Sequence, residues 1–228
     1  MKYLMLALSL LSANVSAQDL DKLNTVVKEN TYFLEIVGEA LPGRERAVLG
    51  NGTGFAVSEY LIVTNNHVAA PANHLRIYNH EGQLVNSAKM IYSDPRYDIA
   101  ILKTRDKMNT FVPLFDELAT VNHLQELYAA GYPLGDKLMI VPGSFQGRSG
   151  GMPHYLRSIS TTAPGMSGGP IFIYNEESER YEVIGIVTAF MYSEERGGII
   201  IRFPTLQLFL STEPVIEYLE ENSILPHK

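Results

Sequence analysis

Short apolar runs rich in β-branched and aromatic residues recur along almost the whole chain. Turn-forming pairs such as Pro42-Gly43, Asn51-Gly52 and Glu81-Gly82 separate them. Many short strands at this spacing are typical of an all-β barrel or sandwich, whereas βαβ units would place helical patterns between the strands. The sequence therefore predicts an all-β fold.

The predicted strands form two groups of about six, joined by a more polar connection at residues 104–127 that contains Pro113. The first group covers residues 31–37, 55–57, 61–64, 75–78, 84–92 and 99–103, and the second covers 126–130, 138–141, 158–162, 171–174, 183–189 and 198–203. Helices are predicted at residues 18–30, 205–210 and 213–219, with Pro204 and Pro214 at positions where a first helical turn tolerates proline.

The N-terminus has the pattern of a secretory signal peptide. A charged start at Lys2 precedes a short apolar run, and the small residues Ser16 and Ala17 close the segment. The run is shorter than the roughly 20 residues that cross a bilayer. We expect cleavage after Ala17, export to the periplasm or the exterior, and no stable membrane insertion afterwards.

Composition narrows the classes of function. The formal net charge of −7 lacks the basic surplus of a nucleic-acid-binding protein. The chain has no cysteine, which excludes disulfides, thiolate metal sites and a cysteine nucleophile. Its histidines show no His-Glu-x-x-His spacing, so we expect no metal and no cofactor.

A serine between glycines, in Gly165-Met166-Ser167-Gly168-Gly169, is the strongest candidate for a reactive group. Glycines allow tight turns and bring backbone N–H groups close to a serine hydroxyl, which is how an oxyanion site is built. An apolar run follows at once and would anchor the turn to a strand. Such a motif alone is equally compatible with an ordinary tight loop.

A nucleophilic serine needs a base and a group that orients the base. His67 follows the apolar run at residues 61–64, and Asp98 precedes the run at residues 99–102. A carboxylate at the head of an apolar strand is costly to bury unless a donor such as a histidine N–H accompanies it. His67, Asp98 and Ser167 are therefore the candidate catalytic residues.

Five motifs together resemble a trypsin-like serine peptidase, most closely the bacterial high-temperature-requirement (HtrA) type without its PDZ domain. They occur in that family's order and span most of the chain: Gly52-Thr53-Gly54-Phe55-Ala56-Val57, Thr64-Asn65-Asn66-His67-Val68, Asp98-Ile99-Ala100-Ile101-Leu102, Gly131-Tyr132-Pro133-Leu134-Gly135 and Gly165-Met166-Ser167-Gly168-Gly169.

The resemblance implies two six-stranded antiparallel β-barrels with a short C-terminal helix. After the leader at residues 1–17, residues 18–118 would carry His67 and Asp98, and residues 119–228 would carry Ser167. The implied roles are general base for His67, orienter for Asp98, nucleophile for Ser167, and oxyanion donors for the N–H groups of Gly165 and Ser167. The implied substrate is a polypeptide.

Further positions follow from the same resemblance. Thr161, Thr188 and Phe190 would line the specificity pocket, and the Thr188 hydroxyl would support Asp98. An uncharged Thr161 does not favour cleavage after Lys or Arg, and we expect small or medium apolar side chains beside the cut. Met166 stands where digestive members carry the aspartate that captures a new N-terminal amine, so that mode of activation is excluded.

Two alternatives stay open. The Gly-x-Ser-x-Gly pattern also fits the nucleophile elbow of α/β-hydrolases, although only His227 follows Ser167 and that fold needs interleaved helices. A protein on a peptidase frame could instead bind partners without turnover, although an intact set of His67, Asp98 and Ser167 argues against this. The sequence does not specify an oligomeric state.

Overall fold

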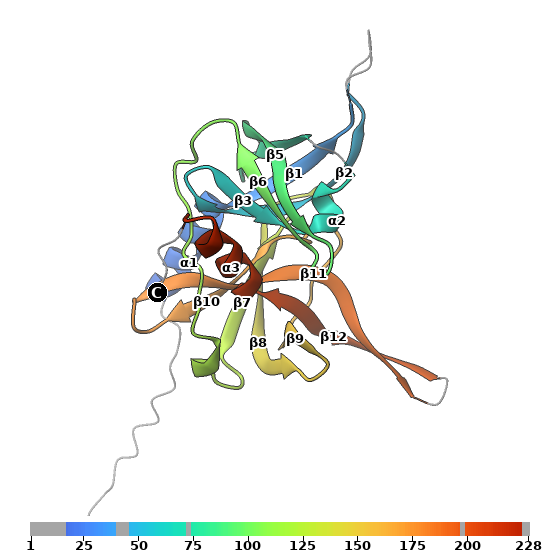
Figure 1. Ribbon diagram of the computed structural model, residues 1–228. Helices are drawn as coiled ribbons and strands as arrows, with labels where there is room; N and C mark the ends of the chain where they lie inside the picture. Colours follow the sequence, from blue (N-terminus) through green and yellow to red (C-terminus); the bar gives the residue numbers. More distant parts are fainter. Residues whose placement is uncertain (1–16, 40–45, 72–73, 197–198, 225–228) are drawn as a thin grey trace, which may run out of the picture.

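The protein forms two β-barrels that lie one above the other in the view of Figure 1. The computed structural model describes residues 17–39, 46–71, 74–196 and 199–224. Each barrel is closed and is built from six antiparallel strands. This confirms the expected double barrel with a short C-terminal helix, and it excludes the α/β-hydrolase alternative, which requires a parallel sheet covered by helices.

The first barrel closes through pairing of its first and fourth strands, in the order β1-β2-β3-β6-β5-β4. Its strands are β1 Thr31–Val37, β2 Val48–Ser58, β3 Leu61–Thr64, β4 His74–Tyr78, β5 Leu84–Asp94 and β6 Ile99–Thr104. Leu34, Ile62 and Leu102 come from three of these strands and are fully buried in one interior cluster. Strands place alternate side chains on one face, which directs these residues into the barrel.

The second barrel repeats the arrangement in the order β10-β11-β12-β9-β8-β7. Its strands are β7 Glu126–Gly131, β8 Met139–Ser149, β9 Met152–Ile159, β10 Pro170–Asn175, β11 Arg180–Arg196 and β12 Ile199–Ser211. The short 3-10 segments Leu118–Thr120 and Pro133–Gly135 lie before and after β7. Leu127, Leu156 and Phe209 fill its interior.

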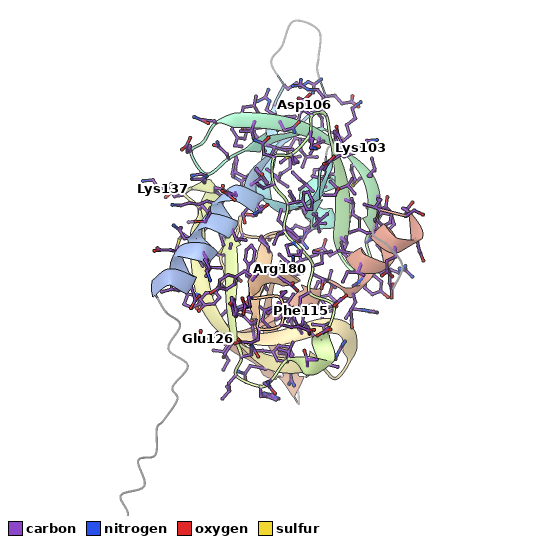
Figure 2. The ribbon with its side chains drawn as sticks, turned by 90° about the vertical axis from the view of Figure 1, so that its left-hand side faces the viewer. Lys103, Asp106, Phe115, Glu126, Lys137 and Arg180 are labelled. Atoms are coloured by element: carbon purple, nitrogen blue, oxygen red, sulfur yellow. The ribbon has the colours of Figure 1, made fainter. Side chains whose placement is uncertain are left out.

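A third apolar cluster joins the two barrels. It contains Phe55 and Ile101 from the first barrel and Phe172 from the second, all of them buried. The helices α1 Ala17–Asn30 and α3 Glu213–Glu221 add Leu23, Val27, Val215 and Leu219 to the same cluster. Figure 2 shows α1 lying across the side of the molecule where the barrels meet. Buried apolar surface therefore fixes the barrels relative to each other, and with them any site between them.

The helix predicted for residues 205–210 is wrong, because these residues belong to β12. They pair with β9, and Leu208 stands opposite Arg157 while Leu210 stands opposite Tyr155. Without this strand the second barrel would stay open and leave backbone groups of β9 unpaired. Tertiary closure of the barrel therefore overrides the local pattern.

Pro204 lies at an irregularity of β12, between the pairs Tyr192 with Phe203 and Met191 with Gln207. A proline has no N–H, so strands tolerate it at such bulges. The predicted helix at residues 213–219 is confirmed as α3, with Pro214 in its first turn.

The predicted leader, residues 1–17, lies outside the described residues except for Ala17, where α1 begins. The predicted division after residue 118 falls in the connection between β6 and β7. In the part of the chain that the structure describes, none of the helices combines the length and the apolarity needed to cross a membrane.

Candidate active site

His67 lies in α2 Asn66–Ala69, a single helical turn that directly follows β3. All four residues of β3 are buried, so the strand holds the start of this turn firmly. Val68 and Ala69 face inward and are buried, while the His67 side chain remains 48% exposed. The local sequence thus anchors the turn by its apolar residues and presents the imidazole to a pocket.

Asp98 lies in the turn before β6 and has a left-handed backbone with φ of 56°. Its carboxylate accepts two hydrogen bonds from His67, one from the backbone N–H at 2.9 Å and one from Nδ1 at 2.7 Å. Because Nδ1 donates to the carboxylate, the neutral ring carries its lone pair on Nε2. That nitrogen is then available to accept a proton from a nucleophile.

The backbone carbonyl of Asp98 is also held. It accepts hydrogen bonds from the Asn66 N–H at 3.0 Å and from the Asn65 side-chain amide at 3.0 Å. Left-handed φ values are unfavourable for residues other than glycine, although aspartate tolerates them better than most. The contacts from Asn65, Asn66 and His67 therefore stabilise a conformation that Asp98 would seldom adopt alone.

Ser167 lies in the turn before β10 and is 6% exposed. It shares a pocket with His67, and the apolar side chains of Ile36, Leu49 and Val68 form much of the remaining wall. Among the described residues, no hydrogen bond joins the Ser167 hydroxyl to the His67 ring. The contact between a nucleophile and its base is often loose before a substrate binds. The shared pocket places Ser167 and His67 at the same cavity.

In the described part of the chain, the N–H groups of Gly165 and Ser167 donate no hydrogen bond, whereas those of Met166, Gly168 and Gly169 do. The Pro164 carbonyl accepts a hydrogen bond from the Leu134 N–H at 2.6 Å. In a trans peptide the C=O and N–H point in opposite directions, so the Gly165 N–H faces away from Leu134. Gly165 and Ser167 both line the pocket, which makes their N–H groups candidate oxyanion donors.

Two glycines of this turn occupy conformations that require glycine. Gly165 has φ of +94° and Gly168 has φ of +83°. A Cβ at Gly168 would overlap the Thr64 hydroxyl and the Thr53 carbonyl. Gly168 therefore lets the second barrel's turn approach the first barrel closely.

Met166 is 1% exposed and packs in the interior of the second barrel, in the same cluster as Phe115 and Ile171. An apolar side chain thus anchors the turn at the position where the sequence analysis excluded activation through an ion pair.

Tyr155 is influenced by the charge of Asp98. Burial raises the pKa of the Tyr155 phenol and the Asp98 charge adds to this effect, so Tyr155 stays neutral.

Three residues were expected to line the specificity pocket. Thr161 is exposed in the loop after β9. Thr188 is 1% exposed, and its hydroxyl donates to the Leu208 carbonyl at 2.9 Å, not to Asp98. Phe190 lies in the part of β11 whose side chains the structure does not describe. Within the described ranges, no group of three or more His, Asp or Glu side chains is placed to hold a metal ion.

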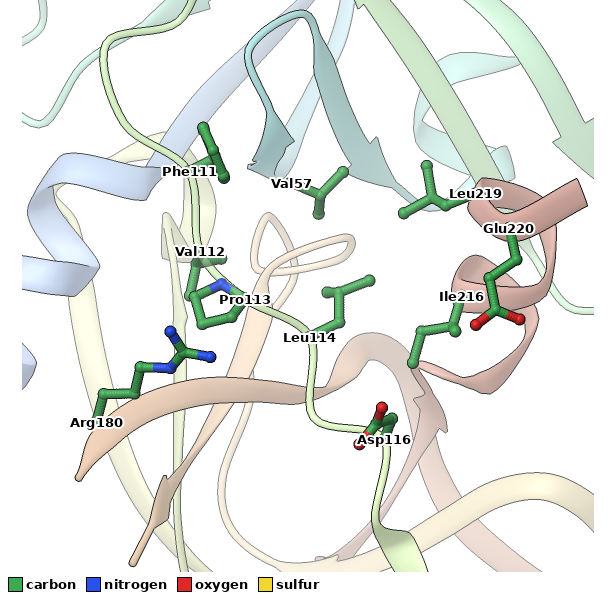
Figure 3. Close-up of a pocket in the computed structure, with 10 residues that line it drawn as sticks. All are labelled: Val57, Phe111, Val112, Pro113, Leu114, Asp116, Arg180, Ile216, Leu219 and Glu220. Atoms are coloured by element: carbon green, nitrogen blue, oxygen red, sulfur yellow. The ribbon is translucent and has the colours of Figure 1, made fainter. Parts of the chain in front are cut away.

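Another apolar pocket lies between the inter-barrel connection and α3 (Figure 3). Its apolar lining includes Val57, Leu114 and Leu219, and its charged lining residues are Asp116, Arg180 and Glu220. None of its lining residues is a serine or histidine, so it offers no nucleophile and base pair. His67 and Ser167, the predicted base and nucleophile, instead line the pocket described above.

Comparison with known proteins identifies the family of this chain. Residues 52–186 match the family of trypsin-like peptidase domains, and this range includes His67, Asp98 and Ser167. The chain belongs to the trypsin-like peptidases. This confirms the family predicted from the five sequence motifs.

The relatives of this trypsin-like peptidase include bacterial proteins named probable periplasmic serine endoprotease DegP-like. The protein from Brucella suis is 36% identical over 169 residues, which is 71% of this chain and 31% of the relative. Those from Ectopseudomonas mendocina and Rhizobium meliloti are 35% and 34% identical, over 63% and 67% of this chain. The trypsin-like peptidase thus spans about a third of the length of these relatives.

Three residues of the site were not singled out from the sequence. Asn65 holds the Asp98 carbonyl, Leu134 holds the Pro164 carbonyl, and Thr53 holds the Gly165 carbonyl at 2.8 Å. All three lie inside motifs that carried the family resemblance. The motifs marked the positions, but the partners lie too far along the chain to be read from spacing.

Proposed function

We propose that this protein is an exported serine endopeptidase that hydrolyses peptide bonds through an acyl-enzyme intermediate. The observation that carries the proposal is the double hydrogen bond between His67 and Asp98, beside a pocket that His67 shares with Ser167. The family and the names of the relatives favour a polypeptide substrate. The leader-like N-terminus and those periplasmic relatives favour a location outside the cytoplasm.

In the first half of the reaction, the Ser167 hydroxyl oxygen attacks the carbonyl carbon of the scissile peptide bond. Its proton passes to His67 Nε2, and the N–H groups of Gly165 and Ser167 stabilise the negative charge on the former carbonyl oxygen. The carbon to nitrogen bond then breaks as His67 returns the proton to the amine that leaves. Asp98 remains ionised and stabilises the imidazolium.

In the second half, a water molecule replaces the amine. It attacks the acyl carbon while His67 Nε2 takes its proton, and the ester bond to Ser167 breaks as the proton returns to the serine oxygen. Ile36, Leu49 and Val68 give the pocket an apolar wall. Apolar side chains of the substrate beside the cut would bury against this wall.

The decisive test is active-site labelling of the protein, produced with its leader in a bacterial host and recovered from the exported fraction. A fluorophosphonate reacts only with activated serines, and the adduct is located by mass spectrometry beside a Ser167→Ala control. We expect stoichiometric labelling confined to Ser167, cleavage of an unfolded protein substrate, and a new N-terminus at Gln18. A folded protein without labelling would instead support a binding role without turnover.

A further inference from the structure

Thr53 joins the first barrel to the turn that carries Ser167. It lies in β2 and is fully buried. Its N–H donates to the Ser167 carbonyl at 2.9 Å, and its hydroxyl donates to the Gly165 carbonyl at 2.8 Å. The same hydroxyl accepts from the Tyr132 N–H at 3.1 Å. One residue of the first barrel therefore contacts three backbone groups that belong to the second.

The Thr53 residue is itself fixed. The Thr64 hydroxyl donates to the Thr53 carbonyl at 2.7 Å, and this contact is buried. Thr64 ends β3, directly before the segment that presents His67. The backbone that positions the candidate base and the backbone that positions the candidate oxyanion turn thus meet at one residue.

Hydrogen bonds occupy the carbonyl groups around Gly165. Leu134 holds the Pro164 carbonyl, and Thr53 holds those of Gly165 and Ser167. A rotation of either peptide plane beside Gly165 would break one of these contacts and could turn a carbonyl oxygen toward the pocket. An oxygen there would repel the developing oxyanion, whereas the present arrangement leaves the N–H groups of Gly165 and Ser167 available.

We infer that the Thr53 hydroxyl is a positioning residue that holds the oxyanion turn in its reactive conformation. The inference rests on the proposed function, since it concerns the same serine. Thr53 does not touch the reacting atoms and acts through the Gly165 carbonyl. A hydroxyl is needed because the position must both donate to a carbonyl and accept from an N–H, which a methyl group of similar size cannot do.

Four variants separate the hydroxyl from the shape of the side chain. Thr53→Val keeps the shape and removes the hydroxyl, and Thr53→Ser keeps the hydroxyl. If the valine variant does not fold, the comparison of Thr53→Ala with Thr53→Ser tests the hydroxyl instead, because these two variants differ only in that group. Thr104→Val is the matched control, because Thr104 is a buried first-barrel threonine whose hydroxyl has no partner among the described residues.

The readouts are the rate of fluorophosphonate labelling at Ser167, kcat and KM on a peptide that the wild type cleaves, and the melting temperature. Loss of one oxyanion donor costs about 100- to 1000-fold in kcat in enzymes of this design, and a displaced turn should approach that range. We expect labelling and kcat to fall at least about 10-fold in Thr53→Val with KM changed little. Thr53→Ser and Thr104→Val should stay close to wild type.

A folded Thr53→Val protein with wild-type labelling and kcat would overturn the inference, and so would a change confined to KM. Crystal structures of wild type and Thr53→Val give a readout that needs no activity. A Gly165 carbonyl turned toward the pocket in the variant supports the inference, and an unchanged turn overturns it. Absence of labelling in the wild type would refute the proposed function, while the crystallographic comparison would still decide the role of Thr53.

Discussion

His67 and Asp98 are held together at two points, because the backbone N–H and the ring Nδ1 of His67 bind different oxygens of the same carboxylate, at 2.9 Å and 2.7 Å. The backbone contact positions the helical turn against Asp98, and the Nδ1 contact orients the ring. Two contacts fix both the position of the helical turn and the tautomer of the ring. The orientation of the candidate base therefore depends on the Asp98 side chain.

Replacing Asp98 with asparagine should abolish most of the activity while preserving the fold. An amide of the same shape can offer its NH2 group to Nδ1 and stabilise the wrong tautomer, which costs about 10⁴-fold in kcat in enzymes of this design. Steady-state kinetics on a peptide substrate measure the loss, and circular dichroism checks the fold. Asp106→Asn, on an exposed carboxylate paired with Arg105, should change kcat by less than about twofold.

Asn65→Leu tests whether the Asp98 backbone conformation depends on the Asn65 amide. The Asp98 carbonyl would keep its hydrogen bond from the Asn66 N–H, so no buried group loses its last partner. We expect a stability loss near the net value of one hydrogen bond, about 1 kcal/mol, together with a clear fall in kcat. Denaturant unfolding and kinetics are measured in parallel. A fall in stability without any change in kcat would show that Asn65 is structural only.

Gly168→Ala should destabilise the protein through two separable effects. A left-handed φ costs a non-glycine residue about 1–3 kcal/mol, and the added Cβ would also overlap Thr64 and Thr53. Gly82→Ala is the matched control, because Gly82 has φ of +77° and open space around the added atom. Thermal unfolding should show a larger loss for Gly168→Ala. Equal losses would contradict the tight contact between the barrels.

Met166→Ala tests the apolar anchor beside Ser167. The side chain is 1% exposed, and truncating such a methionine typically costs about 2–5 kcal/mol. The turn would also lose its interior contact, so the fluorophosphonate labelling rate should fall with stability. Met139→Ala provides the comparison, since Met139 is 50% exposed and its truncation should cost less than about 0.5 kcal/mol. Chemical denaturation of both variants gives the measurement.

The ion pair between Arg148 and Glu213 should make stability depend on pH in a defined direction. Hydrogen bonds from Arg148 lower the pKa of the Glu213 carboxyl, and the nearby His154 contributes in the same direction. Because the pKa of Glu213 is lower in the folded protein than in the unfolded chain, where it is near 4.3, ionised Glu213 stabilises the folded protein above about pH 4.3. This stabilisation is lost as the pH falls through the pKa of the folded state.

Arg148→Met should therefore reduce the free energy of unfolding at pH 7 and have a progressively smaller effect as the solution becomes more acidic than about pH 4. Both side chains are partly exposed, so the difference at pH 7 should stay below about 1 kcal/mol and shrink in 1 M salt. Urea unfolding of both proteins between pH 3 and pH 7 checks this. A difference that is constant with pH would indicate lost packing of the arginine stem instead.

Much of the fold could be predicted because strand patterns are local. The β-branched side chains of residues 61–64 and 99–103 predict two strands, and the structure has β3 and β6 at these positions. Residues 205–210 misled the prediction, because their neighbours in β9 lie about 50 positions earlier in the sequence and barrel closure decided their conformation. The Thr188 hydroxyl was likewise assigned to Asp98 from resemblance, while β11 turns it to the Leu208 carbonyl.

The sequence alone determined which chemical groups are present: a serine between glycines, a histidine after one apolar run and an aspartate before another. It also determined the two sets of strands, since alternation and turn residues act over a few positions. Only the tertiary structure decided that Thr53, 112 positions before Gly165, holds the carbonyl of that residue. Which N–H groups remain free for chemistry depends on how two separately folded barrels pack, and no local preference encodes that contact.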